Sequence, residues 1–376
     1  MDGGLTQRRA RFLGLLNQPD MSPQSTARAL AAALFLAASS ASATVWTVTN
    51  DDLTIAQFDN LTMAHGAASP GDTILIVGNG NRGGTAAMSL DLAKRLTIMG
   101  SGYHRDQVSR VASIRLLERG AQGPGASDSR ILGLVINSLD IADGVSDVLV
   151  KRCRILGRAT LRGAHTTLSE CFIDNIQTNG VQLYGSYISI VKSFINKVNF
   201  SNNIILFENN VFFSGPTPAL ADNTVTFTRN IFINRNTSTS NPMFRVCDRC
   251  NMTSNLFYRQ ETPPEDLSVD IDNRYTNDFA ELGFVAPAIS GNQLAYPRLP
   301  DDDLDYRLLP TSIARGIQTR TGWDAGVHAF GLVGPPYRLR PQIPVVDRFD
   351  LYNPVVPLNT VVEFRAEVSA AQVEEQ

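Results

Sequence analysis

A short pattern of apolar and polar positions recurs along the middle of the chain, between Val148 and Tyr258. Each copy reads apolar, any residue, apolar, two mostly polar residues, one small or amide residue, any residue, and apolar again. The small or amide residue, which we call the anchor, occurs six times, at Cys153, Cys171, Ser193, Asn210, Asn230 and Asn255. Successive anchors are 18, 22, 17, 20 and 25 residues apart. A repeat of this length is typical of a solenoid, in which each unit buries its apolar face by stacking on its neighbours.

Three columns of the repeat are apolar in nearly every copy. They lie five residues before the anchor, three before it and two after it. The first holds Val148, Thr166, Ile188, Ile205, Val225 and Cys250, the second Val150, Leu168, Ile190, Phe207, Phe227 and Met252, and the third Ile155, Ile173, Ile195, Phe212, Phe232 and Phe257. Alternation with a period of two, in β-branched and aromatic residues, predicts short strands whose columns point inward. The anchor then lies in a sharp turn between two strands of each coil.

The repeat resembles the right-handed parallel β-helix proteins of the pectate-lyase-like class. Asn210, Asn230 and Asn255 match the internal asparagine ladder of that class, in which stacked amides hydrogen-bond from coil to coil. Cys153, Cys171 and Ser193 depart from asparagine, although small residues also fit a tight bend. The resemblance implies an all-β fold, a single-stranded right-handed parallel β-helix solenoid, from about Thr44 to Leu332.

The regions at the two ends of the repeat resemble parts of exported bacterial surface β-helix proteins. Apolar residues at helical spacing predict a helix over Leu53–Met63, and Ser69-Pro70-Gly71-Asp72 leads from it into a strand over Thr73–Val77. Such a helix caps the first coil, which would otherwise expose apolar side chains and strand edges. The segment Asp305–Phe330 resembles closing coils, so we expect an end-cap there.

The chain divides into three predicted regions: a signal peptide (1–43), the β-helix (44–332) and a Pro-rich strap with a C-terminal strand (333–376). Arginines precede an apolar run over Ala29–Ala38 and a small-residue site, Ala41-Ser42-Ala43, which predicts cleavage after Ala43 and a secreted or cell-surface location. About ten apolar residues cannot span roughly 30 Å of hydrocarbon, so we expect no transmembrane segment in the mature chain. The strand is expected over Thr360–Val368; either it packs on the end of the solenoid, or the chain has lost a following β-sandwich or sorting domain.

The composition of the chain limits the classes of partner that it is expected to bind. Hydrophobic residues make up 43% of the chain, charged residues 18%, and the net charge is -3. This balance gives no strong attraction to polyanions, so nucleic acid is not an expected partner.

The cysteines do not form a predicted metal site. Cys247-Asp-Arg-Cys250 lacks a second pair or a nearby histidine, so a local disulfide or two free thiols are expected there. Cys153 and Cys171 fall on adjacent coils, within disulfide range if strands stack about 4.8 Å apart. A disulfide and two free thiols both remain open for that pair.

One basic cluster is the candidate ligand-binding surface. It comprises Lys151, Arg152, Arg154, Arg158 and Arg162, one coil from Glu170 and Lys192. Lyases of the resembling class neutralise a uronate carboxylate with calcium or a basic residue and remove a proton with an Arg or Lys base. The cluster could therefore hold a sugar acid, or it could be a solvated turn face.

Two functions follow. The first is a non-catalytic exported scaffold that binds a polysaccharide or surface glycan, or acts as an adhesin. The alternative is a polysaccharide lyase that performs β-elimination on a uronate polysaccharide with a diverged site, for which calcium would be the cofactor; otherwise none is expected. The sequence decides neither whether the chain is an enzyme nor its oligomeric state. Tyr184, Tyr187 and Tyr258 are candidate sugar platforms, and Phe194, Phe212, Phe232 and Phe257 fit a core stack.

Overall fold

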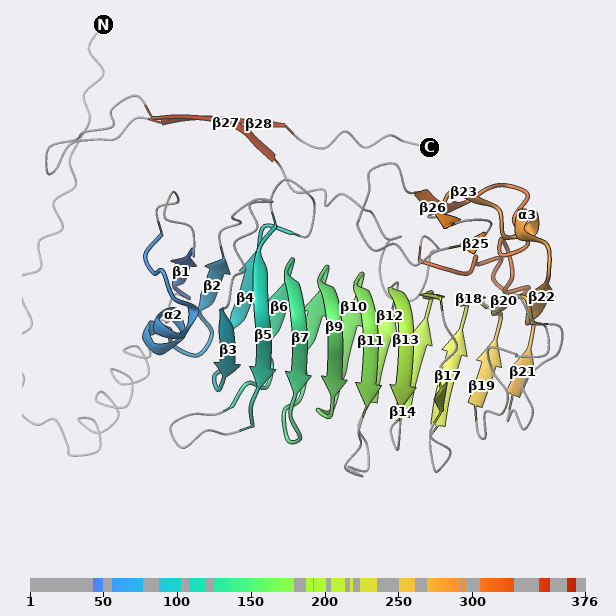
Figure 1. Cartoon of the computed structure of the whole chain (residues 1–376), viewed down its shortest axis with the longest axis horizontal. Coiled ribbons are helices and arrows are strands. Elements are labelled where there is room, and N and C mark those ends of the chain that lie inside the picture. The colour runs from blue at the N-terminus through green and yellow to red at the C-terminus, as the bar shows by residue number, and fades with distance from the viewer. Residues whose placement is uncertain are drawn as a thin grey trace, which may run out of the picture. The chain divides into compact units, whose positions relative to one another are not determined.

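The chain forms a parallel β-helix built from two long sheets (Figure 1). The computed structural model describes residues 43–49, 56–76, 88–102, 108–118, 125–178, 187–191, 193–200, 204–213, 217–218, 224–234, 250–260, 269–287, 289–290, 293–294, 305–327, 345–351 and 364–369. Each sheet holds 11 strands; in sheet B ten of them stack in one row, and β16 pairs with β13 beside β15. The strands of sheet A are β1 (Val45–Val48), β2 (Thr73–Ile76), β4 (Thr97–Gly100), β6 (Arg130–Leu132), β8 (Leu149–Lys151), β10 (Thr166–Ser169), β12 (Tyr187–Val191), β14 (Ile204–Glu208), β17 (Thr224–Thr228), β19 (Cys250–Thr253) and β21 (Val269–Ile271). Those of sheet B are β3 (Ser89–Leu92), β5 (Arg110–Leu116), β7 (Val135–Ile141), β9 (Arg154–Leu161), β11 (Phe172–Thr178), β13 (Phe194–Phe200), β15 (Val211–Phe212), β16 (Thr217–Pro218), β18 (Ile231–Ile233), β20 (Leu256–Tyr258) and β22 (Arg274–Thr276).

The register of the sheets confirms the repeat alignment residue by residue. The second column stacks in sheet A as Val150, Leu168, Ile190, Phe207, Phe227 and Met252. The third stacks in sheet B as Ile155, Ile173, Ile195, Phe212, Phe232 and Phe257. Both columns are buried in one continuous core, where neighbouring rings such as Phe207 and Phe227 stack with centroids 5.0 Å apart. Burial of these apolar columns is the main force that holds coil on coil.

The bend between the two sheets holds a left-handed residue in six of the described coils. The residue before the anchor has φ between 53° and 57° in Arg152, Glu170, Asn209, Arg229, Ser254 and Asp272. The anchor side chain then turns into the bend, while the left-handed residue stands on its outer side. A positive φ is uncommon for residues other than glycine, so the fold holds these residues there at some cost.

The predicted asparagine ladder is confirmed, and it is one rung longer than predicted. Asn210 N donates to Asn230 Oδ1 (2.9 Å), Asn230 N to Asn255 Oδ1 (2.9 Å), and Asn255 N to Asn273 Oδ1 (2.8 Å). Each amide nitrogen also donates to a backbone carbonyl, as Asn230 Nδ2 does to Phe207 O at 2.9 Å. Asn273 was missed because its coil lacks the apolar pattern that marks the others.

The cysteine anchors fill the same bend without an amide ladder. Cys153 and Cys171 carry free, buried thiols, so a disulfide between them is absent. Burial raises the pKa of the Cys153 thiol to about 12 and holds that of Cys171 well above its usual range. Cys250, by contrast, is disulfide-bonded. Cys247 lies outside the described residues.

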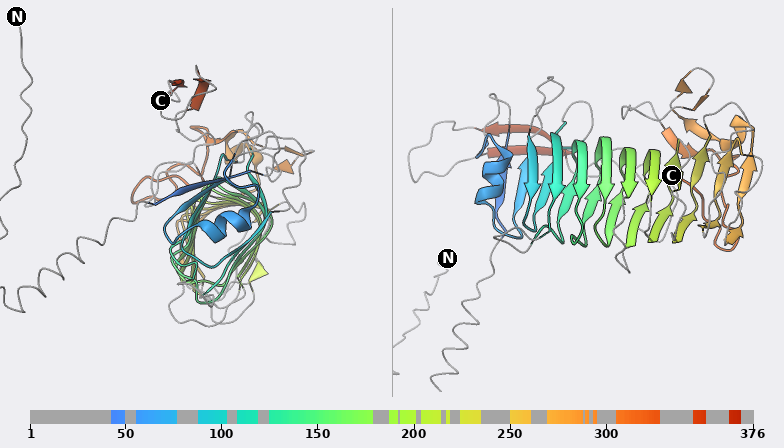
Figure 2. Two further views of the ribbon diagram at one scale, coloured as in Figure 1. Left: turned by 90° about the vertical axis from the view of Figure 1, so that its left-hand side faces the viewer. Right: turned by 60° about the horizontal axis from the view of Figure 1, so that its bottom comes forward.

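A short helix covers the first coil, as predicted, but it begins later. Helix α2 spans Leu61–Ala67, and Asn60 caps it by accepting a hydrogen bond from Thr62 N. Figure 2 (left) shows α2 lying across the end of the coils, where Leu61 and Ala64 enter the core. Of the predicted helix over Leu53–Met63, residues 61–63 lie in α2, but residues 56–60 are not helical, and Phe58 forms a parallel bridge with Val48 instead.

Asp72 explains the motif that precedes β2. Its carboxylate accepts hydrogen bonds from Thr44 N (2.8 Å), Ser69 N (2.8 Å) and Trp46 Nε1 (3.0 Å). Burial raises the pKa of this carboxyl, but these bonds outweigh it, and the pKa lies below its usual value. Asp72 therefore ties the first strand to the second.

The described C-terminal residues cover part of the outer face of sheet B, chiefly over β11 to β20, so the interpretation of the described part of Asp305–Phe330 as closing coils is wrong. Helix α3 (Phe279–Leu282), β23 (Phe284–Ala286) and β26 (Asp305–Leu308) follow the last coil, and β23 pairs with β26 antiparallel. Tyr306 packs on Phe194 with centroids 4.8 Å apart. Residues that point outward from sheet B join this second cluster: Phe172, Phe194, Val211, Phe213, Ile231, Ile233, Leu256 and Tyr258.

The packing of this cover on sheet B shows that two smaller predictions were wrong. Phe194 is buried under Tyr306 and not in the core between the sheets, unlike Phe212, Phe232 and Phe257. Tyr258 is only 3% exposed and is not a sugar platform. Tyr184 and the side chain of Tyr187 lie outside the described residues.

Two hairpins complete the description. Strands β24 (Ile289–Ser290) and β25 (Gln293–Leu294) pair antiparallel, as do β27 (Val345–Leu351) and β28 (Phe364–Ser369). The strand predicted over Thr360–Val368 thus corresponds to β28, paired with a strand that was not predicted. The predicted signal peptide and the Pro335–Pro344 strap lie outside the described residues. Among the residues that are described, no helix is long and apolar enough to cross a membrane.

Candidate functional site

The predicted basic cluster is divided by the fold into a bend and a sheet face. Lys151 and Arg152 lie at the bend, where both pair with Glu170: Lys151 Nζ is 3.1 Å from Oε1 and Arg152 Nε is 2.6 Å from Oε2. Burial raises the pKa of Glu170, yet the two cations outweigh it and the pKa lies below its usual value. Lys151 and Arg152 therefore mainly neutralise the buried carboxylate of Glu170.

The remaining three arginines lie on the outer face of sheet B. Arg162 donates to Asp140 at 2.7 Å, and Asp140 also lies 3.8 Å from Arg115, which itself approaches Asp91. A ladder of alternating charges thus crosses four coils. Arg158 is exposed, with no hydrogen bond or ion pair from its side chain in the described part of the chain. Of the five predicted residues, three are held by carboxylates.

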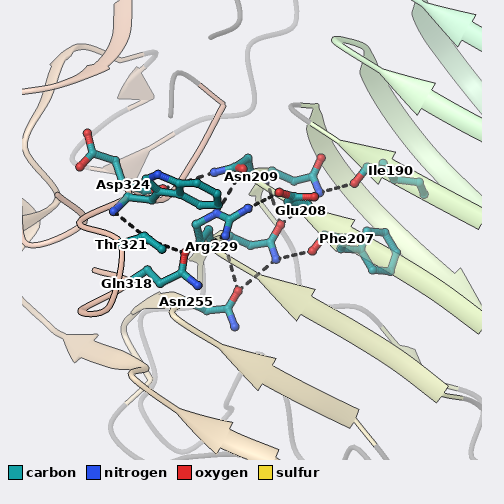
Figure 3. Close-up of polar contacts among 12 residues, drawn as sticks. Ile190, Phe207, Glu208, Asn209, Arg229, Asn255, Gln318, Thr321 and Asp324 are labelled. Atoms are coloured by element: carbon teal, nitrogen blue, oxygen red, sulfur yellow. Dashed lines mark hydrogen bonds and ion pairs between the residues drawn. The ribbon is translucent and has the colours of Figure 1, made fainter. Parts of the chain in front are cut away.

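The buried ion pair of Arg229 and Glu208 lies where the C-terminal cover contacts the bend (Figure 3). Arg229 is 2% exposed and pairs with Glu208, which is 5% exposed. Its guanidinium also donates to Gln318 Oε1 at 2.9 Å and lies 4.6 Å from the ring centroid of Trp323. Asn209 Nδ2 reaches Asp324 O at 3.3 Å. The contacts with Gln318, Trp323 and Asp324 join residues about 90 to 115 positions apart. No local pattern in the sequence indicates them, and their role is structural.

A groove on the other side of the molecule combines four exposed charged side chains. It has a volume of about 470 Å³ and crosses the starts of four successive sheet A strands, β2, β4, β6 and β8. Its lining residues are Gly71, Arg95, Leu96, Thr97, Asp128, Arg130, Asp147 and Leu149. Small-ligand sites have volumes of roughly 300–1,000 Å³, so the groove can hold a ligand of one or a few sugar rings.

The register of sheet A sets the order of these groups. Thr97, Arg130 and Leu149 are direct Cα partners on consecutive coils, and they alternate with the buried Ile98, Ile131 and Val150, so they point outward. Two residues earlier in each coil stand Arg95, Asp128 and Asp147. Adjacent strands are about 4.8 Å apart, so Arg95 lies one coil from Asp128, and Asp128 lies two residues from Arg130. Asp147 follows Asp128 by one coil and lies diagonally from Arg130.

Three of the four charged side chains in the groove have no protein partner. Among the described residues, the guanidinium groups of Arg95 and Arg130 and the carboxylate of Asp128 make no hydrogen bond or ion pair. Asp147 accepts from Ser146 Oγ at 2.7 Å and lies 3.4 Å from His165 Nδ1. The groove therefore presents hydrogen-bonding capacity that the fold leaves unused.

The backbone accounts for the two carboxylates but not for the arginines. Asp128 and Asp147 have φ of 61° and 59°, a conformation that aspartate tolerates better than most residues. Arg130 lies in a regular strand, where threonine or leucine takes the same place in neighbouring coils. Sequence reasoning missed the groove because corresponding residues on neighbouring coils are 33 and 19 positions apart (Arg95 to Asp128, Asp128 to Asp147) and form no local motif. An arginine in an outward strand position was the available signal.

The described residues contain no group of three or more His, Cys, Asp or Glu side chains placed to hold a metal ion. Comparisons of the chain with protein-family models, curated proteins and solved structures gave no match. The arguments for function therefore rest on the geometry of this chain.

Proposed function

We propose that the protein is an exported, non-catalytic scaffold that binds a surface glycan or polysaccharide in the groove on sheet A. The observation that carries this proposal is the set of unpaired charged groups, Arg95, Asp128 and Arg130, aligned across consecutive coils of a rigid sheet. Guanidinium and carboxylate groups hydrogen-bond sugar hydroxyls strongly because one partner of each bond is charged. A rigid array of such groups binds with little loss of conformational entropy in the protein.

The direction of the groove supports an extended ligand. It runs across four coils, a distance of about 14 Å at the usual strand spacing. A chain of sugars lying across the strands would meet different polar groups at successive coils: Arg95 and Thr97, then Asp128 and Arg130, then Asp147. The stacking of the coils thus aligns several contacts for one extended ligand, which suits an adhesive or structural role.

Export and the pectate-lyase-like relationship remain parts of the same proposal. Secretion follows from the arginines and apolar run ahead of Ala43, and the asparagine ladder supports the likeness to that class. Mass spectrometry of the secreted protein should find Thr44 as the first residue. A retained Arg28 would contradict cleavage at this site.

A polysaccharide lyase is the second candidate, and Arg158 is the observation that favours it. Its exposed guanidinium carries no ion pair in the described part of the chain and stands beside Ser138 and Asn175 on sheet B. A basic residue free of a carboxylate partner is what proton abstraction from a uronate requires. Calcium would assist there by neutralising the uronate carboxylate.

One experiment separates the two functions. The protein is incubated with a panel of immobilised glycans and, in parallel, with soluble uronate polysaccharides, with and without calcium. The scaffold proposal expects retention on a glycan, no ultraviolet absorbance from unsaturated sugars, and loss of retention in the Arg95→Gln/Arg130→Gln variant. Release of unsaturated product, abolished by Arg158→Gln, would establish the lyase instead.

A further inference from the structure

We infer that the groove selects a neutral, polyhydroxylated sugar and discriminates against acidic glycans; this inference rests on the proposed glycan-binding function. It is carried by the charge arrangement of the groove. Two arginines, Arg95 and Arg130, face two aspartates, Asp128 and Asp147, so the lining is neutral overall. Protein surfaces select partners whose potential is complementary to their own.

The aspartates oppose an acidic sugar at the position where it would have to lie. In sheet A, Asp128 follows Arg95 by one coil and precedes Arg130 by two residues, and Asp147 comes one coil later. A uronate carboxylate bound to either arginine would lie within a few ångströms of an exposed carboxylate of like charge, which weakens binding. The same geometry places a guanidinium beside any cationic group bound to the aspartates.

A neutral sugar can use all four groups at once. Each hydroxyl both donates and accepts, so it can donate to Asp128 or Asp147 and accept from Arg95 or Arg130. The half-buried Leu149 and Thr97 offer aliphatic surface between the charges for the C–H face of a ring. A neutral sugar can therefore satisfy both the donors and the acceptors that the groove leaves unused, whereas an anionic group can satisfy only the donors.

Two variants test this inference with opposite expected signs. Asp128→Asn/Asp147→Asn removes both negative charges and keeps the side-chain size, while Arg95→Gln/Arg130→Gln removes both positive charges. All four side chains are more than a third exposed, so both variants should keep the melting temperature of the wild type. Arg110→Gln, which removes an exposed arginine on sheet B that belongs to neither candidate site, is the matched control.

Binding is measured by calorimetry with glucose, mannose and galactose tetrasaccharides and with a galacturonate tetrasaccharide, at low and high salt. We expect the wild type to bind at least one neutral tetrasaccharide more tightly than galacturonate, with little salt dependence. Asp128→Asn/Asp147→Asn should raise the galacturonate affinity about tenfold and make it sensitive to salt. Arg95→Gln/Arg130→Gln should lose the neutral sugar, and Arg110→Gln should match the wild type.

The possible failures point to different conclusions. Tighter binding of galacturonate by the wild type, or neutral-sugar binding that both groove variants retain, would overturn the selectivity and leave glycan binding standing. If none of the four tetrasaccharides binds and the glycan panel retains nothing either, the proposed function itself falls.

Discussion

The outer faces of the two sheets use charge in different ways. On sheet B and the adjoining bend, most charges are paired: Arg162 with Asp140, Lys151 and Arg152 with Glu170, Arg229 with Glu208. The last of these pairs lies under the C-terminal cover. On sheet A, Arg95, Asp128 and Arg130 stand exposed without protein partners in the described part of the chain. The difference indicates that the first set of charges stabilises the fold, whereas the second is available to a ligand.

The largest loss of stability is expected from Arg229→Met. The substitution leaves the Glu208 carboxylate buried without a cation and removes the contact with Trp323. Breaking a buried pair in this way costs about 3–5 kcal/mol of unfolding free energy. Urea denaturation would measure it, with Arg95→Met on sheet A as the exposed counterpart, expected within about 0.5 kcal/mol of the wild type.

Restoring the balance of charge should recover part of this loss. In Glu208→Gln/Arg229→Met the buried charge is gone, so the double variant should be more stable than Arg229→Met alone. Equal stability of the two variants would argue that the pair matters only through packing.

The asparagine ladder should show the next largest effect. Asn230→Leu removes an amide whose oxygen accepts from Asn210 N and Asn210 Nδ2 and whose nitrogen donates to Phe207 O, and leucine can replace none of these bonds. Leaving buried groups unpaired costs about 1–3 kcal/mol. The matched change at a cysteine anchor, Cys171→Val, removes only weak thiol contacts at 3.2–3.6 Å and should cost less than about 1.5 kcal/mol. Equal losses at the two anchors would mean that the ladder adds nothing beyond packing.

The repeat and the C-terminal cover also differ in how far they could be predicted from the sequence. The inward columns, the bend and three ladder asparagines could be read from the repeat because stacking imposes the same choice on every coil. The cover could not, since outward residues such as Phe172, Phe194 and Phe213 look like further core positions until Tyr306 is placed on them. Lys151 and Arg152 pair with the residue of the next coil that lies at the bend, Glu170. The spacing of residues in one sequence does not identify that residue, so these ion pairs could not be predicted.

The ion pairs of Glu170 should make the stability of the fold depend on pH. This effect should be smaller than the losses above, and its sign is defined. Lys151 and Arg152 hold the pKa of Glu170 below its ordinary value of 4.5, against the effect of burial. The ionised carboxylate therefore stabilises the fold above that value, and this contribution is lost as the pH falls through the lowered pKa. In thermal melts, Glu170→Gln should be less stable than the wild type at neutral pH and should converge with it in acid. A constant difference at all pH values would contradict the ion pairs.

The smallest effect is expected from a reducing agent. Cys153 and Cys171 already carry thiols, and the core and ladder do not depend on the bond made by Cys250. The melting temperature should fall by no more than about 2–4 °C, which corresponds to about 1 kcal/mol for a domain of this size. A larger fall would give the disulfide a share in the stability of the coils.

The assignment of the two faces is tested most directly by a crystal structure of the protein with the tetrasaccharide that binds best. The account predicts sugar density in the groove, with hydroxyls within hydrogen-bond distance of Arg130 and Asp128 and no sugar on sheet B. Density on the outer face of sheet B, beside Arg158, with an empty groove on sheet A would contradict it.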